Sequence, residues 1–490
     1  MSFNFIKKSV GIALSLALTC SILSSCKPDK KILTDPKNPV TITVWHYYNG
    51  ALKNAFDSMI KEFNETIGMK EGIIVEGVSH GDIDELEDSV TGALTQEVGY
   101  EDLPNIFASY ADLAYTADQK NVLIDLNKYF SEDELSKFIP SYVEEGKISN
   151  DGSLKILPIA KSTEVFMINK TDWEPFAEAE NLTYDDLKTK EGLVEVAEKY
   201  YNWTDNLTPD IANDGKAFYG RDALANLFIV GSKQLGNEIF SVENGEVHLN
   251  LDKDIIRKIW DNYYVPYVKG YFYSNGRYRS DDAKVGDIIA LIGSTASVAY
   301  FPTAVTINDE THDIESDILT VPVFGDGETV NVQQGAGMVV TKSTDEEEFA
   351  SVEFLKWFTD TQQNIQFSAA SGYLPVVAEA NDINVYMNEC KELGIDLNDM
   401  THNTLVKAFE EVNTGEMYTY KAFANGSDAR DILSHNLADK AVADRKAFIA
   451  DLESGATFED TCKNFFTDEK FERWFEKFKS QLEDVISQGN

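Results

Sequence analysis

Val40-Thr41-Ile42-Thr43-Val44-Trp45 alternates as a β-strand does, and it begins the folded part of the chain. Apolar residues then recur at helical spacing from Leu52 to Phe63, with Gly68 near the expected end of that helix. A strand followed directly by an amphipathic helix is typical of an α/β protein, in which helices cover the faces of a mostly parallel sheet.

The same alternation continues along the chain. A second strand is predicted over 73–78, a second helix over 83–98 and a third strand over 105–109. Ser343 or Thr344 caps a helix whose first turn holds four acidic residues, the charge that a helix N-terminus favours. Further strands are predicted over 156–160, 165–168, 287–293, 297–301 and 335–341, and further helices over 184–201, over 252–267 and from about 382 to the end.

The first residues are typical of a targeting segment. Lys7 and Lys8 precede an uncharged apolar run that is too short to span a bilayer. Leu23-Ser24-Ser25-Cys26 resembles the lipobox of bacterial lipoproteins, which predicts a signal peptide over 1–25, lipid on Cys26 and an extended tether over 26–39. We therefore expect a protein anchored at the outer surface of the cell membrane, the alternative being a plain secretory signal or a short anchor.

Composition limits the partners. The chain has 43 basic and 83 acidic residues, a net charge of −40, so nucleic acid is not an expected partner. The acidity is explained either by solubility or by a cationic ligand. Cys390 and Cys462 lie far apart in apparently helical contexts and are expected to be free thiols.

A search for catalytic motifs predicts no enzyme and no cofactor. The chain has no phosphate-binding glycine loop, no zinc-binding His-Glu-x-x-His helix and no Gly-x-Ser-x-Gly nucleophile elbow. The aromatic run Trp45-His46-Tyr47-Tyr48-Asn49-Gly50 is more informative, because it follows the first strand, where open α/β sheets place their ligand crevice. Rings beside amide and hydroxyl groups suit a sugar, unless Trp45 and Tyr47 point into the core.

With these residues in view, the chain resembles an extracellular solute-binding protein of the first ABC-transporter family, the group that includes maltose-binding protein. The resemblance covers most of the mature chain, and its most specific pieces are Gly335-Ala336-Gly337-Met338-Val339-Val340, Phe354-Leu355-Lys356-Trp357-Phe358 and Ser371-Gly372-Tyr373-Leu374-Pro375-Val376. Asn105 stands where the family usually has Asp, and the tryptophan expected after Gly293 is absent, which weakens the case for ring stacking there.

The resemblance implies an α/β, two-lobed periplasmic-binding-protein fold of type II. Each lobe is then a helix-flanked, mostly parallel sheet made of discontinuous segments, 40–158 plus 336–380 for the N-terminal lobe and 159–335 plus 381–490 for the C-terminal lobe. The resemblance also implies ligand contacts from the cleft between the lobes. Carried over position by position, these contacts are Tyr47, Tyr48, Asn49, Ser109, Tyr110, Asp112, Ser162, Glu164, Gly293, Ser294, Thr295, Gln334, Gly335 and Tyr373.

The predicted function is that of a lipid-anchored, monomeric substrate receptor of an ABC importer. It would capture a small solute, a mono- or oligosaccharide, without covalent chemistry, and deliver it to a membrane permease. One alternative is a receptor for a polyamine or another cation, suggested by the acidity and by Tyr263-Tyr264 and Tyr271-Phe272-Tyr273. The other is a surface glycan hydrolase or a structural adhesin.

Overall fold

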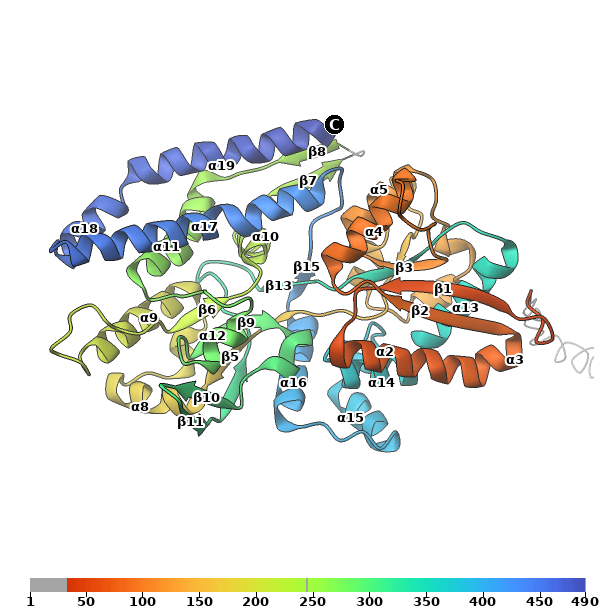
Figure 1. Ribbon diagram of the computed structural model, residues 1–490, viewed down its shortest axis with the longest axis horizontal. Helices are drawn as coiled ribbons and strands as arrows, with labels where there is room; N and C mark the ends of the chain where they lie inside the picture. The colour runs from red at the N-terminus through yellow and green to blue at the C-terminus, as the bar shows by residue number, and fades with distance from the viewer. Residues whose placement is uncertain (1–32, 244–245, 490) are drawn as a thin grey trace, which may run out of the picture.

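The computed structural model describes residues 33–243 and 246–489, and its fold is built around two larger sheets in separate lobes (Figure 1). The sheet of the first lobe has the order β2-β1-β3-β14-β4. Its strands are β1 (Val40–His46), β2 (Ile73–Ser79), β3 (Ile106–Ser109), β4 (Ile156–Leu157) and β14 (Gly337–Val340). The helices of this lobe are α2 (Gly50–Phe63), α3 (Met69–Glu71), α4 (Ile83–Thr95), α5 (Ala111–Gln119), α6 (Glu132–Leu135), α7 (Pro140–Glu145), α13 (Asp345–Phe358) and α14 (Thr361–Ser371).

The second lobe has a sheet of order β12-β5-β9-β6. Its strands are β5 (Glu164–Asn169), β6 (Tyr219–Arg221), β9 (Ala290–Ser294) and β12 (Ser316–Leu319). Its helices are α8 (Lys170–Glu180), α9 (Lys190–Asp205), α10 (Leu224–Gln234), α11 (Lys253–Lys269), α12 (Arg279–Lys284), α17 (Gly426–Glu453), α18 (Phe458–Phe465) and α19 (Asp468–Gly489). Small two-stranded pairs join β7 (Phe240–Glu243) to β8 (Glu246–Leu249), β10 (Ala304–Ile307) to β11 (Glu310–Asp313) and β13 (Val330–Val332) to β15 (Glu416–Tyr418).

The predicted two-lobed α/β fold is confirmed, but strand direction is mixed where the sequence predicted mostly parallel sheets. β1 is parallel to β2 and β3, whereas β14 is antiparallel to β3 and β4. In the second lobe β5 is antiparallel to both of its neighbours, and only β6 and β9 run parallel. The reason is the connectivity: β14 and β5 each enter their lobe from the other one, so their direction is not set by a local strand-helix-strand unit.

Several predicted boundaries shift. The second helix ends at Thr95 rather than at 98, because Gln96 takes a left-handed conformation. The strand predicted over 287–293 is β9, Ala290–Ser294. The strand predicted over 297–301 is wrong: the Ser294 hydroxyl accepts from the Ala296 N–H and starts a 3-10 helix, Thr295–Tyr300.

The folded part of the chain begins before the end of the tether predicted over 26–39. Cys26 and the signal segment lie outside the described residues, but Asp35 and Asn38 already form a turn. The Thr34 hydroxyl donates to the Glu71 carbonyl at 2.5 Å, and Gly72, with φ +74°, lies so close to Asp35 that a Cβ there would meet its carbonyl carbon at 2.4 Å. The end of the predicted tether is therefore part of the folded lobe.

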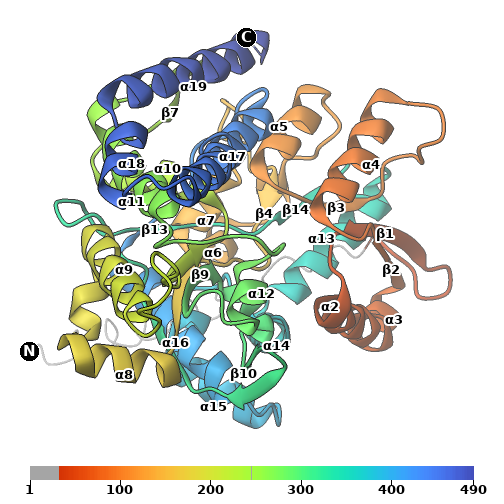
Figure 2. The ribbon, with the colours of Figure 1, turned by 60° about the vertical axis from the view of Figure 1, so that its left-hand side comes forward.

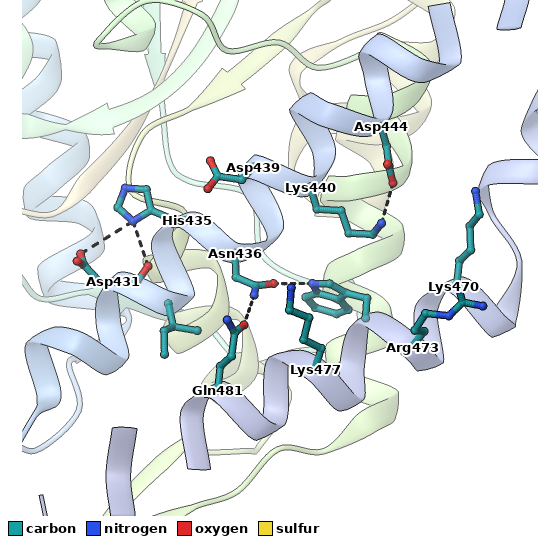
Figure 3. Close-up of a pocket in the computed structure, with 12 residues that line it drawn as sticks. Asp431, His435, Asn436, Asp439, Lys440, Asp444, Lys470, Arg473, Lys477 and Gln481 are labelled. Carbon is teal, nitrogen blue, oxygen red and sulfur yellow. Dashed lines mark hydrogen bonds and ion pairs between the residues drawn. The ribbon is translucent and has the colours of Figure 1, made fainter. Parts of the chain in front are cut away.

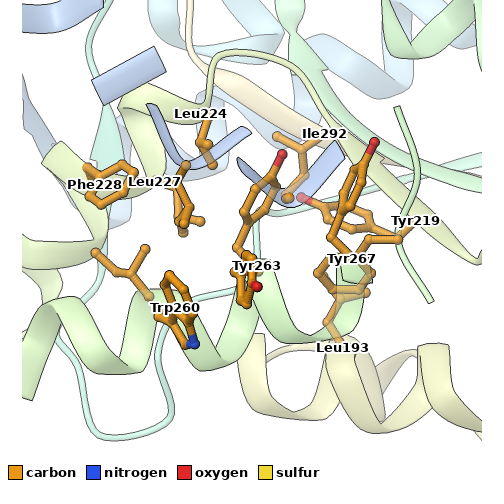
Figure 4. Packing of buried hydrophobic residues seen from close by; sticks show 14 of the residues in the cluster. Leu193, Tyr219, Leu224, Leu227, Phe228, Trp260, Tyr263, Tyr267 and Ile292 are labelled. Atoms are coloured by element: carbon orange, nitrogen blue, oxygen red, sulfur yellow. The ribbon is translucent and has the colours of Figure 1, made fainter. Parts of the chain in front are cut away.

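Each lobe has its own hydrophobic core. Figure 4 shows part of the second core, where Trp260 and Tyr263 of α11 lie beside Leu227 of α10, and Tyr267 of α11 lies beside Tyr219. The alternative of a cationic solute was suggested in part by Tyr263-Tyr264 and Tyr271-Phe272-Tyr273. The first four of these rings are buried in this core, so they cannot line a cation site, whereas Tyr273 is only partly buried. Cys390 and Cys462 are free thiols, as predicted.

Three chain segments cross between the lobes and pair with one another. The Lys161 N–H donates to the Leu374 carbonyl at 3.0 Å, and the Ser162 N–H donates to the Gln334 carbonyl at 2.9 Å. Helices α15 (Ile383–Glu392) and α16 (Asp399–Thr414) pack on both sides of this junction, α15 on α14 and α16 on β12 and β5. The lobe boundary predicted at 380/381 stays a prediction.

Candidate functional site

A cavity of about 300 Å³ lies between the lobes. The first lobe contributes α4, α5 and the end of α7, and the second lobe contributes α10 and the first turns of α17. Residues 332–334, from one crossing segment, and residues 418–420, at the end of β15, form its floor. Figure 2 shows α17 beside α5 at this point. Any molecule held there touches both lobes, so it can favour one arrangement of the lobes over another.

Tyrosines from three separate segments of the first lobe meet beside this cavity. The Tyr47 and Tyr373 hydroxyls are 3.1 Å apart. Tyr110, which lines the cavity, keeps 36% of its surface exposed. Burial raises the pKa of Tyr47 and Tyr373, and the neighbouring tyrosines, Tyr110 among them, raise it further. Tyr110 therefore offers its ring face and hydroxyl group to a ligand, and Tyr47 and Tyr373 support it from behind.

A chain of polar contacts runs from the cavity into the second lobe. Arg430 Nη2 on α17 donates to Asn226 Oδ1 at 2.7 Å. Asn226 Nδ2 donates to Gln334 Oε1 at 3.1 Å and to Glu164 Oε1 at 2.8 Å. Arg221 Nη2 lies 3.0 and 2.9 Å from the two Glu164 oxygens. This network fixes the orientation of Asn226, Gln334 and Arg430, so the wall that they form is preorganised.

The acidic residues of the cavity are perturbed by one another. Asp112 accepts from the Tyr420 hydroxyl at 2.7 Å, and burial raises its pKa to about 6. Burial, followed by repulsion from Asp112, Asp84 and Asp431, raises the pKa of Glu87 to about 7. The cavity therefore concentrates negative charge from both lobes.

The floor of the cavity is held by a buried ion pair. Lys161 Nζ donates to both Glu145 oxygens and to the Gly335 carbonyl, each at 2.8 Å. Gly335 has φ +103°, and a Cβ there would meet the Ala160 carbonyl at 3.1 Å, so glycine is needed where the crossing segments touch.

Of the predicted contacts, the cavity brings together Tyr110, Asp112 and Gln334, with Tyr47 and Tyr373 beside them. Gly335 and Ser162 act through the backbone of the crossing segments, and Glu164 is occupied by Arg221 and Asn226. Asn49 donates to the Gly81 carbonyl at 2.8 Å at the rim of the first lobe.

The remaining predicted contacts lie elsewhere. Tyr48 is 1% exposed and packs against His46, Phe56 and Phe367, so it belongs to the core of the first lobe. Ser109 is buried, and its hydroxyl donates to the Tyr110 carbonyl. Gly293 and Ser294 are the last residues of β9, Thr295 begins the 3-10 helix that follows, and none of the three lines this cavity. These residues are left out of the proposed site.

Sequence reasoning missed Asn226, Arg430, Asp431, Glu87 and Tyr420. Each stands in a helix or a loop without a local motif, and only the packing of α4, α10 and α17 brings them together. Composition gave a partial signal, since the acidity of the chain pointed to a possible cationic ligand.

A larger groove of about 880 Å³ lies between α17 and α19 on the outer side of the second lobe (Figure 3). Trp474, only 6% exposed, donates from Nε1 to Asn436 Oδ1 at 2.6 Å, and Asn436 Nδ2 donates to Gln481 Oε1 at 2.6 Å. All of its lining residues come from the second lobe, so lobe closure does not enclose it. Within residues 33–243 and 246–489, no cluster of three candidate ligands for a metal ion occurs, and no helix is long and apolar enough to cross a membrane.

Comparisons with known proteins agree on the fold. A family described as bacterial extracellular solute-binding protein matches residues 58–392. The cyclic α-maltosyl-1,6-maltose binding protein of Arthrobacter globiformis is similar with a TM-score of 0.65 at 19% identity, covering 92% of this chain and 100% of that one. UgpB from Mycobacterium tuberculosis, in complex with glycerophosphocholine, is similar with a TM-score of 0.64 at 17% identity and the same coverage.

A third solved structure is Lmo0181 of Listeria monocytogenes in complex with cycloalternan. It has a TM-score of 0.60 at 16% identity and covers 90% of this chain and 100% of that one. No curated protein matches this sequence. At these identities, the solved structures show a shared fold and do not define a shared ligand.

Proposed function

This chain belongs to the bacterial extracellular solute-binding protein family, and from that membership we propose that it captures a sugar or oligosaccharide in the cavity between its lobes. Members of this family serve ABC importers outside the cytoplasm. The observation that carries the proposal is the joint lining of one cavity by Tyr110 from the first lobe and by Asn226 and Gln334 from the second lobe and the crossing segment. Flat rings beside amide and hydroxyl groups match a sugar, which has apolar faces and polar edges.

The proposed mechanism is capture without covalent chemistry. A solute that bridges α5 and α17 binds the closed arrangement better than the open one, and that difference drives closure. A micromolar dissociation constant corresponds to about −8 kcal/mol, the net value after closure and loss of water. The cavity of about 300 Å³ is at the lower end of small-molecule sites, which favours a short saccharide. The closed form then docks on a permease and releases its solute unchanged.

Thermal unfolding in the presence of a saccharide panel tests this function. A saccharide at 100 times its dissociation constant is expected to stabilise the protein by about 2.7 kcal/mol. Tyr110→Ala is expected to weaken the binding of that ligand at least ten-fold. Tyr115→Ala serves as the matched control, because Tyr115 lies on α5, the helix that Tyr110 precedes, but outside this cavity. If no mono- or oligosaccharide raises the unfolding temperature, the proposal fails.

We also propose that the protein is a monomer held at the membrane by lipid on Cys26. Thr34, which contacts Glu71, follows Cys26 by eight residues, so the first lobe is tied within about 27 Å of the lipid. Radiolabelled palmitate is expected to enter the wild-type protein and not Cys26→Ala, and the variant is expected in the soluble fraction. A membrane-bound Cys26→Ala contradicts the anchor.

A further inference from the structure

The charges that line the interlobe cavity do not balance. Lys161 neutralises Glu145, and Arg430, the one basic side chain among the described lining residues, offsets Asp112. Asp84 and Glu87 on α4 have no ion pair with a described residue. Asp431 faces them from α17, and its one ion-pair partner among the described residues is the imidazole of His435 at 4.0 Å, which carries a charge only when protonated. Three carboxyl groups from two lobes thus have no Lys or Arg partner among the described residues.

A buried acceptor in the floor of the cavity is also unpaired. Gln333 is 4% exposed, and its Nε2 donates to Glu145 Oε2 at 2.5 Å and to the Ser141 carbonyl at 3.2 Å. That donation fixes the amide orientation, because a flipped amide would turn its oxygen toward two other oxygens. Gln333 Oε1 has no hydrogen-bond partner among the described residues, and Gln333 lines the same cavity. A buried acceptor of this kind calls for a donor from the ligand.

Closure of the lobes brings the unpaired carboxylates of α4 and α17 toward each other. With the lobes apart, water solvates the carboxylates of α4 and of α17 separately, and closure brings them to one cavity, where like charges repel. The raised pKa of Glu87 agrees with this crowding, to which Asp112, Asp84 and Asp431 contribute after burial. A cation between the helices removes the repulsion only in the closed form, so it adds directly to the preference for closure.

We propose that the solute carries a protonated amine, which sits between α4 and the first turns of α17 against Glu87 and Asp431. This inference rests on the proposed function and narrows its substrate class to amine-bearing saccharides. The exposed Tyr110 ring provides a face that attracts a cation. A bound metal ion is a poorer occupant, because no three candidate ligands cluster closely enough among the described residues.

Isothermal titration at pH 7 with matched monosaccharides tests the proposal. Glucose is compared with 2-amino-2-deoxyglucose and 6-amino-6-deoxyglucose, which replace one hydroxyl group by an amine at different ring positions. At least one amino sugar is expected to bind ten-fold or more tightly than glucose, and this preference is expected to shrink as salt rises from 50 to 300 mM. Maltose and spermidine complete the set, as a neutral disaccharide and an amine without a sugar.

Variants that each remove one carboxylate test where the amine of the solute binds. Glu87→Gln and Asp431→Asn are each expected to reduce the amine preference several-fold and to leave glucose binding unchanged. Asp439→Asn, which removes the same charge from α17 two turns further along and outside the cavity, is expected to change neither.

The outcomes separate the two proposals. If glucose binds as tightly as the two amino sugars, the proposal of a protonated amine is wrong, and the proposal of a saccharide receptor is unaffected. If spermidine binds and no saccharide binds, the proposal of a protonated amine is supported and the proposal of a saccharide ligand is wrong. Binding of none of the five probes overturns both.

Discussion

At the scale of single residues, Glu411 of α16 ties the crossing segments together. It is 2% exposed, and its carboxyl group accepts from the Val321 N–H at 2.9 Å and from the Thr163 hydroxyl at 3.2 Å. Its backbone carbonyl accepts from Asn331 Nδ2 at 3.1 Å. Burial raises its pKa from 4.5 to about 8, so the folded protein holds a proton that the unfolded chain releases.

Glu411→Gln therefore changes the pH dependence of stability. Because the folded pKa is raised, the contribution of Glu411 is fully present below about pH 4.5 and is lost as the pH rises to about 8. The scale is roughly 1.4 kcal/mol for each pH unit of displacement. In urea unfolding at pH 5 and pH 8, the variant is expected to lose less stability than the wild type. Glu410→Gln, an exposed neighbour paired with Lys407, is expected to follow the wild type.

Lys161 allows a second prediction at this scale. Its side chain is buried against Glu145 and the Gly335 carbonyl, so Lys161→Met leaves Glu145 charged without its partner. Loss of one member of a buried pair costs about 3–5 kcal/mol, and Lys161→Met with Glu145→Gln is expected to recover part of that. Lys147→Met, which removes an exposed pair with Glu144, is expected to cost less than about 1 kcal/mol in the same urea titrations.

At the scale of elements, α13 shows how a local signal fixes a helix start. Thr344 accepts from the Glu347 N–H at 3.3 Å, and the Glu347 carboxylate accepts from the Thr344 N–H at 3.1 Å, a reciprocal cap. The sequence left Ser343 and Thr344 as alternatives, and the structure selects Thr344.

Thr344→Ala is expected to lower the free energy of unfolding by about 1 kcal/mol, because α13 loses its N-terminal cap. Ser343→Ala is the control, since its side chain does not cap the helix, and a change within about 0.5 kcal/mol is expected there. Equal losses in chemical denaturation for the two variants would show that Thr344 is not the cap.

At the scale of the whole molecule, an exposed charge pair joins the lobes across the cleft, in addition to the hydrogen bond from Tyr420 to Asp112. Arg277 of the second lobe lies 3.9 Å from Asp82 of the first, and both side chains are solvent-exposed. Such a pair contributes at most about 1 kcal/mol, and we expect a bound solute to add to the preference for closure.

We therefore expect small-angle scattering to report a smaller radius of gyration in the presence of saturating solute. Arg277→Ala is expected to lower the affinity for the solute by no more than about five-fold, because only one exposed ion pair is lost. A radius that does not change on saturation would contradict a receptor that closes on its ligand.

The sequence by itself determined the elements whose signals are local. The alternation in Val40–Trp45 predicted β1, the acidic turn after Thr344 predicted α13, and the ordered glycine and tyrosine motifs indicated the two-lobed fold. Tertiary structure alone determined which side chains line the cavity. Tyr48 and Tyr110 are both tyrosines that follow a strand, yet one is buried in the core and the other lines the cleft.

The physical reason is the distance along the chain between the groups that meet. Glu87, Asn226 and Arg430 stand on three helices with no shared periodicity, and only the packing of those helices brings them to one cavity. Local spacing sets which face a side chain takes on its own element, whereas the partner of that face is set by contacts between lobes that no single segment encodes.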